Sequence, residues 1–332
     1  MVLDTSVAVI QYPSLVQWLA DRLGGAIAAH YESANLPAQS PHSASTTLEP
    51  RATVPSDLMP VPLFTPSAQQ FGTFSSPVLL QLSKGAGTPT AQILGEKVLQ
   101  HFEDQIADQT QTNELSPQLW VHPKGWLYAY FDADNLAKWL QTLMMAQPIL
   151  VLEEPIRGGV DLRSPISADP VIFGLQHAHA RCCSLLRLAQ QERVLPPHDL
   201  EHFFTDGGLA LWQTDSGELR LQTQAEQGLL LALMQFPQSL SPQKMMYGCC
   251  NAAVAGAETR LSWILPQKHL SKQAMVWSQL FADFHRDCRL FGDVQRNTPQ
   301  LAEARFGLVY IVKKVLAFLL EEILQETAPI TL

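Results

Sequence analysis

The chain has 332 residues, of which 46% are hydrophobic and 16% are charged, and its formal net charge is −9. This length is enough to bury more than one apolar core, and the composition excludes a largely disordered chain. The acidic balance also excludes a protein that binds nucleic acid through net charge alone, because phosphate contacts normally require a basic surface.

The first 150 residues predict an α+β domain. Apolar residues at helical spacing predict helices over 14–31, 77–83, 90–104 and 134–145. Residues 119–131 predict a hairpin around the sequence His122-Pro-Lys-Gly125. The segment 36–66 is crowded with Pro, Ser and Thr, cannot bury enough apolar surface to order itself, and is expected to be a mobile loop.

Residues 151–168 are rich in Pro, Gly and charge and predict a linker. The remainder, 169–332, predicts a mainly α-helical domain. Its expected helices cover 170–193, 199–205, 224–236, 241–264, 268–288 and 299–326. Alternating apolar residues around Asp215-Ser-Gly217 predict that 209–221 is an exposed hairpin.

The cysteines favour a reducing compartment. They form two adjacent pairs, Cys182–Cys183 and Cys249–Cys250, plus Cys288, and this odd total does not suit an extracellular disulfide framework. The N-terminus lacks the basic cluster and apolar core of a signal peptide. The most apolar segment, 306–320, is too short for a membrane span and contains two lysines. We therefore expect a cytoplasmic protein with no membrane association.

The helix expected at 170–193 carries the most specific motif of the chain. Its sequence Gln176-His-Ala-His-Ala-Arg-Cys-Cys-Ser-Leu-Leu-Arg187 resembles the helix that opens the DALR anticodon-binding domain of arginyl-tRNA synthetases. The matching residues are Gln176, Ala178, His179, Ala180, Arg181, Ser184 and Arg187. Segments 226–237, 280–285 and 305–320 resemble later helices of that domain. The resemblance implies a DALR-type anticodon-binding-like domain over 169–332.

The N-terminal half has a weaker resemblance to the additional domain of these synthetases, which contacts the elbow of tRNA. Residues 71–84, which end at Lys84, and 122–128 carry it. The chain departs from the family pattern at Thr73, where the family has Asp, and at Pro77, where it has Asn. Its last residues, 321–332, lack the terminal Gly and Met of the family. The departure at Pro77 removes a side-chain amide that the resemblance implicates in recognition of the elbow, and the C-terminal departure counts against reading of the arginine anticodon.

In a synthetase, a Rossmann-type catalytic domain with two ATP-binding loops separates these two regions. Here only residues 151–168 separate them, and no His-x-Gly-His sequence occurs. The segment Lys244-Met-Met-Tyr247 resembles the second ATP loop in spelling but lies on the wrong side of the anticodon-domain helix. We therefore expect a protein that is not an enzyme and uses no cofactor.

The tRNA-binding candidates implied by the resemblance are Gln176, His179, Arg181, Arg187 and Lys84. Arginine can hold phosphate with a bidentate fork, although a solvated or salt-bridged face is the simpler interpretation of Arg181, Arg187 and Arg193. His179 and Cys183 would share a helix face. No Cys-x-x-Cys spacing accompanies them, so small core cysteines explain them better than a metal site.

Two functions remain open. The resemblance favours a tRNA-binding accessory protein, a non-catalytic paralogue of arginyl-tRNA synthetase. The alternative is a protein-interaction or assembly factor that reuses the synthetase scaffold and binds a protein through aromatic residues such as Trp212, Trp263 and Trp277. Tryptophan at helical spacing is more often a core residue. The sequence does not identify the tRNA or the protein partner, nor the oligomeric state.

Overall fold

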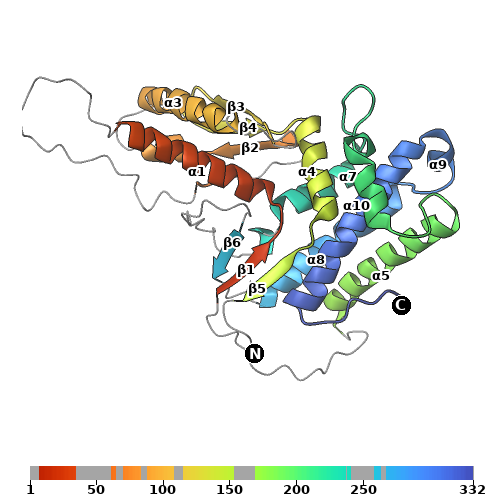
Figure 1. Cartoon of the computed structure of the whole chain (residues 1–332). Coiled ribbons are helices and arrows are strands. Elements are labelled where there is room, and N and C mark those ends of the chain that lie inside the picture. Colours follow the sequence, from red (N-terminus) through yellow and green to blue (C-terminus); the bar gives the residue numbers. More distant parts are fainter. Residues whose placement is uncertain are drawn as a thin grey trace, which may run out of the picture.

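The protein is described here by a computed structural model. It describes residues 7–34, 61–64, 70–83, 88–107, 115–152, 169–236, 238–240, 258–262 and 267–331. Figure 1 shows an α+β part built from the first half of the chain, packed beside a larger helical part built from the second half. This layout confirms the α+β and mainly helical composition expected for the two halves.

The α+β part contains a three-stranded antiparallel sheet covered on one face by helices. Its strands, in spatial order, are β2 (Thr73–Ser76), β4 (Leu127–Tyr130) and β3 (Gln118–Val121). Alternate strand residues are buried beneath α1 (Leu15–Ala34) and α3 (Thr88–Ala107). Trp18 of α1 packs edge-on against Phe102 of α3 and against Phe131, so one aromatic cluster joins both helices to the sheet.

The expected elements of this part are confirmed. The hairpin around His122–Gly125 is the β3–β4 pair, with Val121 opposite Leu127. The helices expected at 77–83 and 134–145 are α2 (Val78–Leu82) and α4 (Ala133–Met145). Helix α4 begins where its N-cap, Asp132, accepts a hydrogen bond from the backbone N–H of Asn135 at 3.0 Å.

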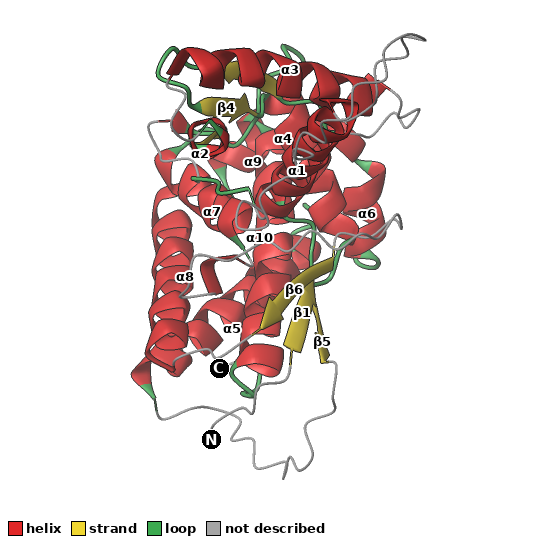
Figure 2. Ribbon diagram, turned by 90° about the vertical axis from the view of Figure 1, so that its left-hand side faces the viewer, coloured by secondary structure: helices red, strands yellow, loops and turns green. Residues whose placement is uncertain are grey.

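A second antiparallel sheet combines strands from distant parts of the chain (Figure 2). The central strand β1 (Val7–Gln11) pairs with β5 (Ile149–Leu152) on one side and β6 (Glu258–Ser262) on the other. The helix expected at 241–264 is therefore wrong at 258–262, and the rest of that range lies outside the described residues. The pairing of β6 with the start of the chain is a long-range contact, which local apolar spacing cannot reveal.

Two predicted connections fall largely outside the described residues. Of the expected mobile loop 36–66, the described part is 61–64. There Val61 is buried, and Phe64 exchanges two backbone hydrogen bonds with Ser75. Of the expected linker 151–168, residues 151–152 belong to β5, and 153–168 lie outside the described residues.

The helical part is built around three long, packed helices: α5 (Pro170–Gln191), α8 (Gln267–Asp287) and α10 (Pro299–Phe318). Shorter helices surround them: α6 (Leu200–Asp206), η3 (Gly208–Leu211), α7 (Gln224–Gln235), η4 (Gln238–Leu240) and α9 (Asp293–Asn297). A π-helix, η5 (Leu319–Ile323), follows α10 directly. The five helices expected at 170–193, 199–205, 224–236, 268–288 and 299–326 are thus confirmed. Among the described residues, no helix is both long and apolar enough to cross a bilayer.

The expected exposed hairpin at 209–221 is confirmed only at its tip, where backbone hydrogen bonds join Thr214 to Glu218 and Arg220 to Trp212 around an exposed turn. Its first residues form the 3-10 helix η3, and only one bridge, between Gln213 and Leu219, pairs the two arms. Trp212 and Leu221 are fully buried, and the exposed residues of the segment are Ala210 and the turn at 215–218. The alternating apolar residues belong to a short loop that folds back on the core. Burial of their side chains contributes more there than strand pairing. Trp212 and Trp277 are core residues, and Trp263 lies outside the described residues.

The two parts are joined by polar contacts at the end of α4. Gln141 donates to the carbonyls of Phe204 and Thr205 at 3.3 and 2.8 Å and accepts from the indole of Trp212 at 3.0 Å. The ammonium of Lys314 in α10 donates to three carbonyls at the end of α4, over 2.5–3.1 Å. The Lys314 bonds satisfy carbonyl groups at the end of α4 that have no partner within the helix itself.

Candidate nucleic-acid interface on helix α5

Helix α5 is a locally basic element in an acidic chain. Its sequence contains two arginines and two histidines and no Asp or Glu. The helix begins at Pro170, after Asp169 accepts a hydrogen bond from the Val171 N–H at 2.8 Å. It ends before Arg193, which has a positive φ of 58°. The candidate residues divide between two sides of this helix.

One side of α5 faces the C-terminal segment of the chain. Gln176 is fully buried, and its amide donates to the Thr327 carbonyl at 2.9 Å. His179 is 4% exposed, and its Nδ1 lies 2.9 Å from the Pro329 carbonyl. A carbonyl only accepts hydrogen bonds, so Nδ1 carries the hydrogen. Neither predicted site residue can touch a ligand while this segment is in place.

Arg187 lies at the boundary between the covered side and solvent. Its Nη2 donates to the Ile330 carbonyl at 3.1 Å and to the Ser184 hydroxyl at 3.2 Å. The residue is exposed. A guanidinium group has five N–H donors, so donors remain for a phosphate after these two contacts.

The other side of α5 faces solvent and carries aromatic and cationic side chains. The guanidinium of Arg181 contacts Nε2 of His285 in α8 at 3.1–3.3 Å. Partial burial lowers the pKa of His285, and the nearby charges of Arg181 and His177 lower it further. A neutral His285 accepts from Arg181 and fixes its direction. The ring of exposed Phe173 lies 6.4 Å from that of His177, one turn before Arg181.

The arginines of α5 differ from two other exposed arginines of the helical part, Arg286 and Arg296. Arg286 and Arg296 form ion pairs with neighbouring aspartates at 2.7–2.9 Å. Among the described residues, no carboxylate pairs with Arg181 or Arg187. Of the expected solvated or salt-bridged face, the solvated alternative holds for these two exposed residues. Their charge is available to an anionic ligand.

The His179–Cys183 pair does not form a metal centre with any third ligand in the described part of the chain. The Cys183 sulfur lies 3.9 Å from Nε2 of His179. Burial raises the pKa of Cys183 and raises that of fully buried Cys182 well above its ordinary value. Both side chains are therefore thiols at neutral pH, which suits the core role expected for them.

The sequence did not lead us to predict a second candidate surface, an exposed aromatic face on the α+β part. On the outer face of the β2-β4-β3 sheet, Trp120 and Tyr128 occupy paired positions and stack at 5.4 Å between ring centroids. His122 lies 5.9 Å from Tyr128, and Trp120 is 40% exposed. Trp120 and His122 are two residues apart, as are Tyr128 and Tyr130, and residues two apart in a strand point to the same face. This spacing of aromatic residues was the sequence signal that could have found the surface. Lys84, the candidate from this half, lies outside the described residues.

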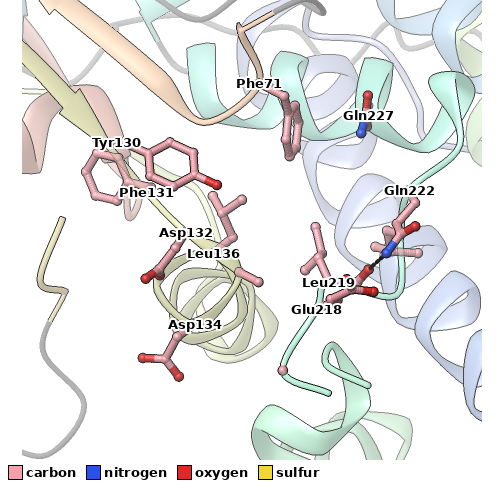
Figure 3. Close-up of a pocket in the computed structure, with 13 residues that line it drawn as sticks. Phe71, Tyr130, Phe131, Asp132, Asp134, Leu136, Glu218, Leu219, Gln222 and Gln227 are labelled. Carbon is pink, nitrogen blue, oxygen red and sulfur yellow. Dashed lines mark hydrogen bonds between the residues drawn. The ribbon is translucent and has the colours of Figure 1, made fainter. Parts of the chain in front are cut away.

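The cavity between the two parts has the wrong charge for nucleic acid (Figure 3). It has a volume of about 450 Å³ and is lined on one side by Phe71, Tyr130 and residues at the start of α4. The carboxylates of Asp132, Asp134 and Glu218 lie along it. Phosphate groups would be repelled here, so the α5 surface is the better nucleic-acid candidate.

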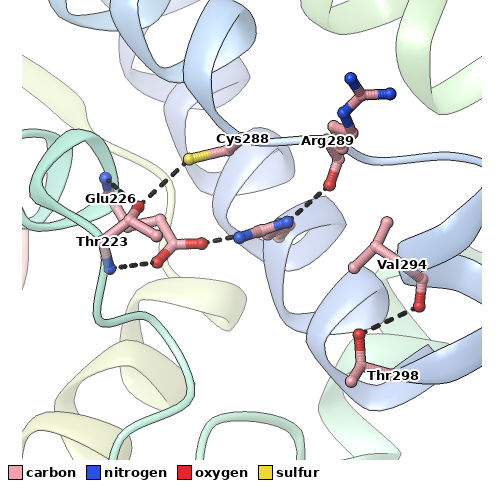
Figure 4. A network of polar contacts seen from close by, with 7 residues as sticks. Thr223, Glu226, Cys288, Arg289, Val294 and Thr298 are labelled. Carbon is pink, nitrogen blue, oxygen red and sulfur yellow. Dashed lines mark hydrogen bonds and ion pairs between the residues drawn. The ribbon is translucent and has the colours of Figure 1, made fainter.

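A buried polar network behind α5 is structural (Figure 4). Arg305 donates through Nε to Glu226 at 2.6 Å and through Nη1 to the Arg289 carbonyl at 2.6 Å. Glu226 in turn accepts from the Thr223 N–H at 2.7 Å and completes a capping box at the start of α7. All members are satisfied internally, so this network holds α7, α10 and the segment after α8 together.

Comparison with known proteins points to one enzyme family. The chain is 29% identical over 178 residues to the arginine–tRNA ligase of Synechococcus sp. (strain JA-3-3Ab), which is 54% of this chain and 25% of that ligase. It is 42% identical over 94 residues to the ligase of Chlorobium phaeovibrioides, or 26% of this chain and 15% of the ligase. The chain is arginyl-tRNA synthetase-like.

A third arginine–tRNA ligase, from Desulfitobacterium hafniense, is 30% identical over 172 residues, which is 51% of this chain and 24% of that ligase. The three matches span between 26% and 54% of this synthetase-like chain and at most a quarter of these ligases. No family model matches the chain, and no solved structure matches it.

Proposed function

We propose that the protein is a non-catalytic arginyl-tRNA synthetase-like protein that binds tRNA in the cytoplasm. The observation that carries this proposal is the surface of α5. In a chain of net charge −9, this helix has no carboxylate and exposes Arg181 and Arg187 without ion-pair partners among the described residues. Both arginines stand at positions of the DALR-domain motif that the sequence resembles.

The geometry supports a division of tRNA contacts between the two parts. The helical part, as a DALR-type domain, contacts the anticodon stem through the solvent side of α5. The α+β part contacts the elbow through the aromatic face of Trp120, Tyr128 and His122. Exposed aromatic rings on a sheet are suited to stacking on unpaired bases, and such stacking tolerates any base sequence.

The first test is direct binding of unmodified bulk tRNA to the purified full chain at low salt. Retardation of tRNA, with weaker retardation of a DNA duplex of the same length, supports the proposal. If tRNA migrates unchanged at protein concentrations far above those used for a synthetase, the proposal is wrong.

The non-catalytic role has its own test. Only residues 153–168 connect β5 to α5, and this segment is too short to hold a nucleotide-binding sheet. We expect no ATP–pyrophosphate exchange dependent on arginine and no arginine charging of tRNA. Exchange above the background of a heat-inactivated sample would contradict this expectation.

A protein partner is the alternative, and exposed apolar residues favour it. Phe173 and Leu188 of α5 are 42% and 40% exposed, and Met275 and Val276 of α8 are 57% and 39% exposed. A pull-down from native lysate, scored for co-purifying RNA and protein, separates the two functions. Enrichment of tRNA that is lost after ribonuclease treatment favours tRNA binding, whereas one stoichiometric protein that survives the treatment favours an assembly factor.

A further inference from the structure

The last residues of the chain cover the inner side of α5. After the π-helix η5, the backbone turns at Gln325, which has a φ of 57°, and two backbone hydrogen bonds close this turn onto Leu319 and Leu320. The following residues, 327–331, run along α5 and are called the strap. Ala328 of the strap packs against the core, while Ile330 is 65% exposed.

Three side chains of α5 attach the strap through its backbone. Gln176, His179 and Arg187 reach the carbonyl oxygens of Thr327, Pro329 and Ile330, respectively, at 2.9–3.1 Å. The strap contains no helix or strand, and none of its residues is fully buried. Weakly packed segments of this kind open at a small fraction of the global free energy of unfolding, so the strap can detach without unfolding the helices.

Among the described residues of this attachment, His179 is the one whose ordinary pKa lies between pH 5 and 8. Its Nδ1–H is used by the Pro329 carbonyl, and its Nε2 faces the Cys183 sulfur at 3.9 Å. A second proton would therefore enter at Nε2 and place a positive charge beneath the strap, at a residue that is 4% exposed. No carboxylate of the described residues pairs with this position.

The groups around His179 do not compensate such a charge. Lys313 of α10 adds positive charge, and Arg187 and the thiols of Cys182 and Cys183 are its neighbours on α5. Glu321 and Glu322 of η5 are exposed to solvent. Arg181 and His285, between α5 and α8, pair with each other on the opposite side of the helix.

We propose that the strap is a pH-sensitive cover of α5, which protonation of His179 detaches. Detachment exposes Gln176 and His179 and adds a cation to the basic surface. The proposal does not require that this surface bind RNA, so it can hold even if the proposed function fails.

The direction of the effect follows from linkage. Burial, and to a lesser degree Lys313, lower the pKa of His179 from 6.5, against the opposing hydrogen bond to Pro329. Detachment returns the ring to water, which removes the lowering by burial, the largest cause, and this outweighs the loss of the Pro329 hydrogen bond, so the detached state has the higher pKa and takes up the proton first. The contribution of neutral His179 to attachment is thus fully present above about pH 6.5 and weakens below it, with the ratio of detached to attached strap rising about tenfold per pH unit until the pKa of the attached state is reached.

The test is a methyl NMR titration of the full chain from pH 8 to pH 5. The Ala328 methyl, assigned through Ala328→Gly, reports the strap, and the buried methyl of Ala304 in α10 reports the fold. We expect the Ala328 signal to move to an unstructured position with the same midpoint as the His179 ring, while Ala304 stays unchanged. A His179 ring that titrates while Ala328 does not move would overturn the proposal, and so would an Ala328 signal that is constant over the whole range.

Two variants sharpen the test. His179→Gln keeps an N–H donor for the Pro329 carbonyl but cannot be protonated, so Ala328 should stay in its attached position down to pH 5. The matched control, His177→Gln, removes the exposed histidine on the opposite side of α5 and should leave the titration unchanged. Titration of Ala328 in His179→Gln with the wild-type midpoint, or its disappearance in His177→Gln, would assign the effect to another group.

Discussion

Two arginines of the helical part, Arg305 and Arg187, show how similar residues serve different ends. Arg305 is buried, and its guanidinium is used by Glu226 and by the Arg289 carbonyl. Arg187 is exposed, contacts a hydroxyl and a terminal carbonyl, and has no carboxylate partner among the described residues. Both lie in segments that resemble arginyl-tRNA synthetases. Sequence resemblance alone therefore does not separate residues that hold the fold from residues that can meet a ligand.

The same division runs through the candidate site residues. Gln176 and His179 are covered by the C-terminal strap, whereas Arg181 and Arg187 face solvent. The covered pair serves the fold in the attached state. The exposed pair carries the proposed tRNA contacts. The predictions below test the interior network first and the exposed surface last.

The largest expected effect is on the interior. In Glu226→Gln, Arg305 keeps its charge but loses its carboxylate, and an uncompensated buried charge costs about 3–5 kcal/mol. We expect a loss of this size in the free energy of unfolding, measured by urea denaturation. Glu218→Gln removes an exposed carboxylate at the turn before α7 and should change stability by less than about 0.5 kcal/mol. Equal losses in the two variants would mean that the Glu226–Arg305 pair does not hold the helical part.

The next effect is at the junction of the two parts. Lys314→Met keeps the length of the side chain but leaves three carbonyls at the end of α4 without their donor, so we expect a loss of about 1–3 kcal/mol in the free energy of unfolding. Its neighbour Lys313 is half-buried and lies over the Tyr310 ring at 5.1 Å. Lys313→Met should cost less than about 1 kcal/mol, since a partly solvated cation–π contact contributes little. The reverse order of the two losses would show that Lys314 does not tie α4 to α10.

Burial also lowers the pKa of Lys314 to about 8. Because this pKa is above 7, the ammonium form still predominates at neutral pH, and the charge of Glu201 favours it. This residue was read in the sequence only as a lysine that interrupts an apolar helix, because its partners are backbone atoms of a helix far away along the chain.

Much of the helical content could be predicted because the long helices α1, α3, α5, α8 and α10 carry apolar residues at regular spacing. The failures share one cause. β6 is decided by its pairing with β1, and the 209–221 loop by burial of Trp212 and Leu221, and both depend on contacts that local spacing does not contain. The motif placed Arg181 and Arg187 correctly on one helix. It could not show that the strap covers Gln176 and His179, since the strap follows more than a hundred residues later.

A smaller effect is expected for Arg181. This arginine is exposed, and its guanidinium contacts only the ring of His285 among the described residues. Arg181→Ala should therefore change the free energy of unfolding by less than about 1 kcal/mol, because arginine and alanine are both good helix formers. A loss in the free energy of unfolding as large as that of Glu226→Gln would show that Arg181 stabilises the fold and is not only part of the exposed surface.

The most direct test of the central claim is tRNA binding to wild type, Arg187→Ala and the control Arg296→Ala, followed by fluorescence anisotropy over a salt series. Arg187→Ala should weaken binding by about 10- to 100-fold, as expected for a charge-assisted phosphate contact, with unchanged unfolding. Arg296, which is paired with Asp293 on α9, should be neutral. The wild-type salt dependence should be shallow and correspond to about two to four phosphates. Wild-type affinity in Arg187→Ala, or no tRNA binding at low salt, would contradict the account.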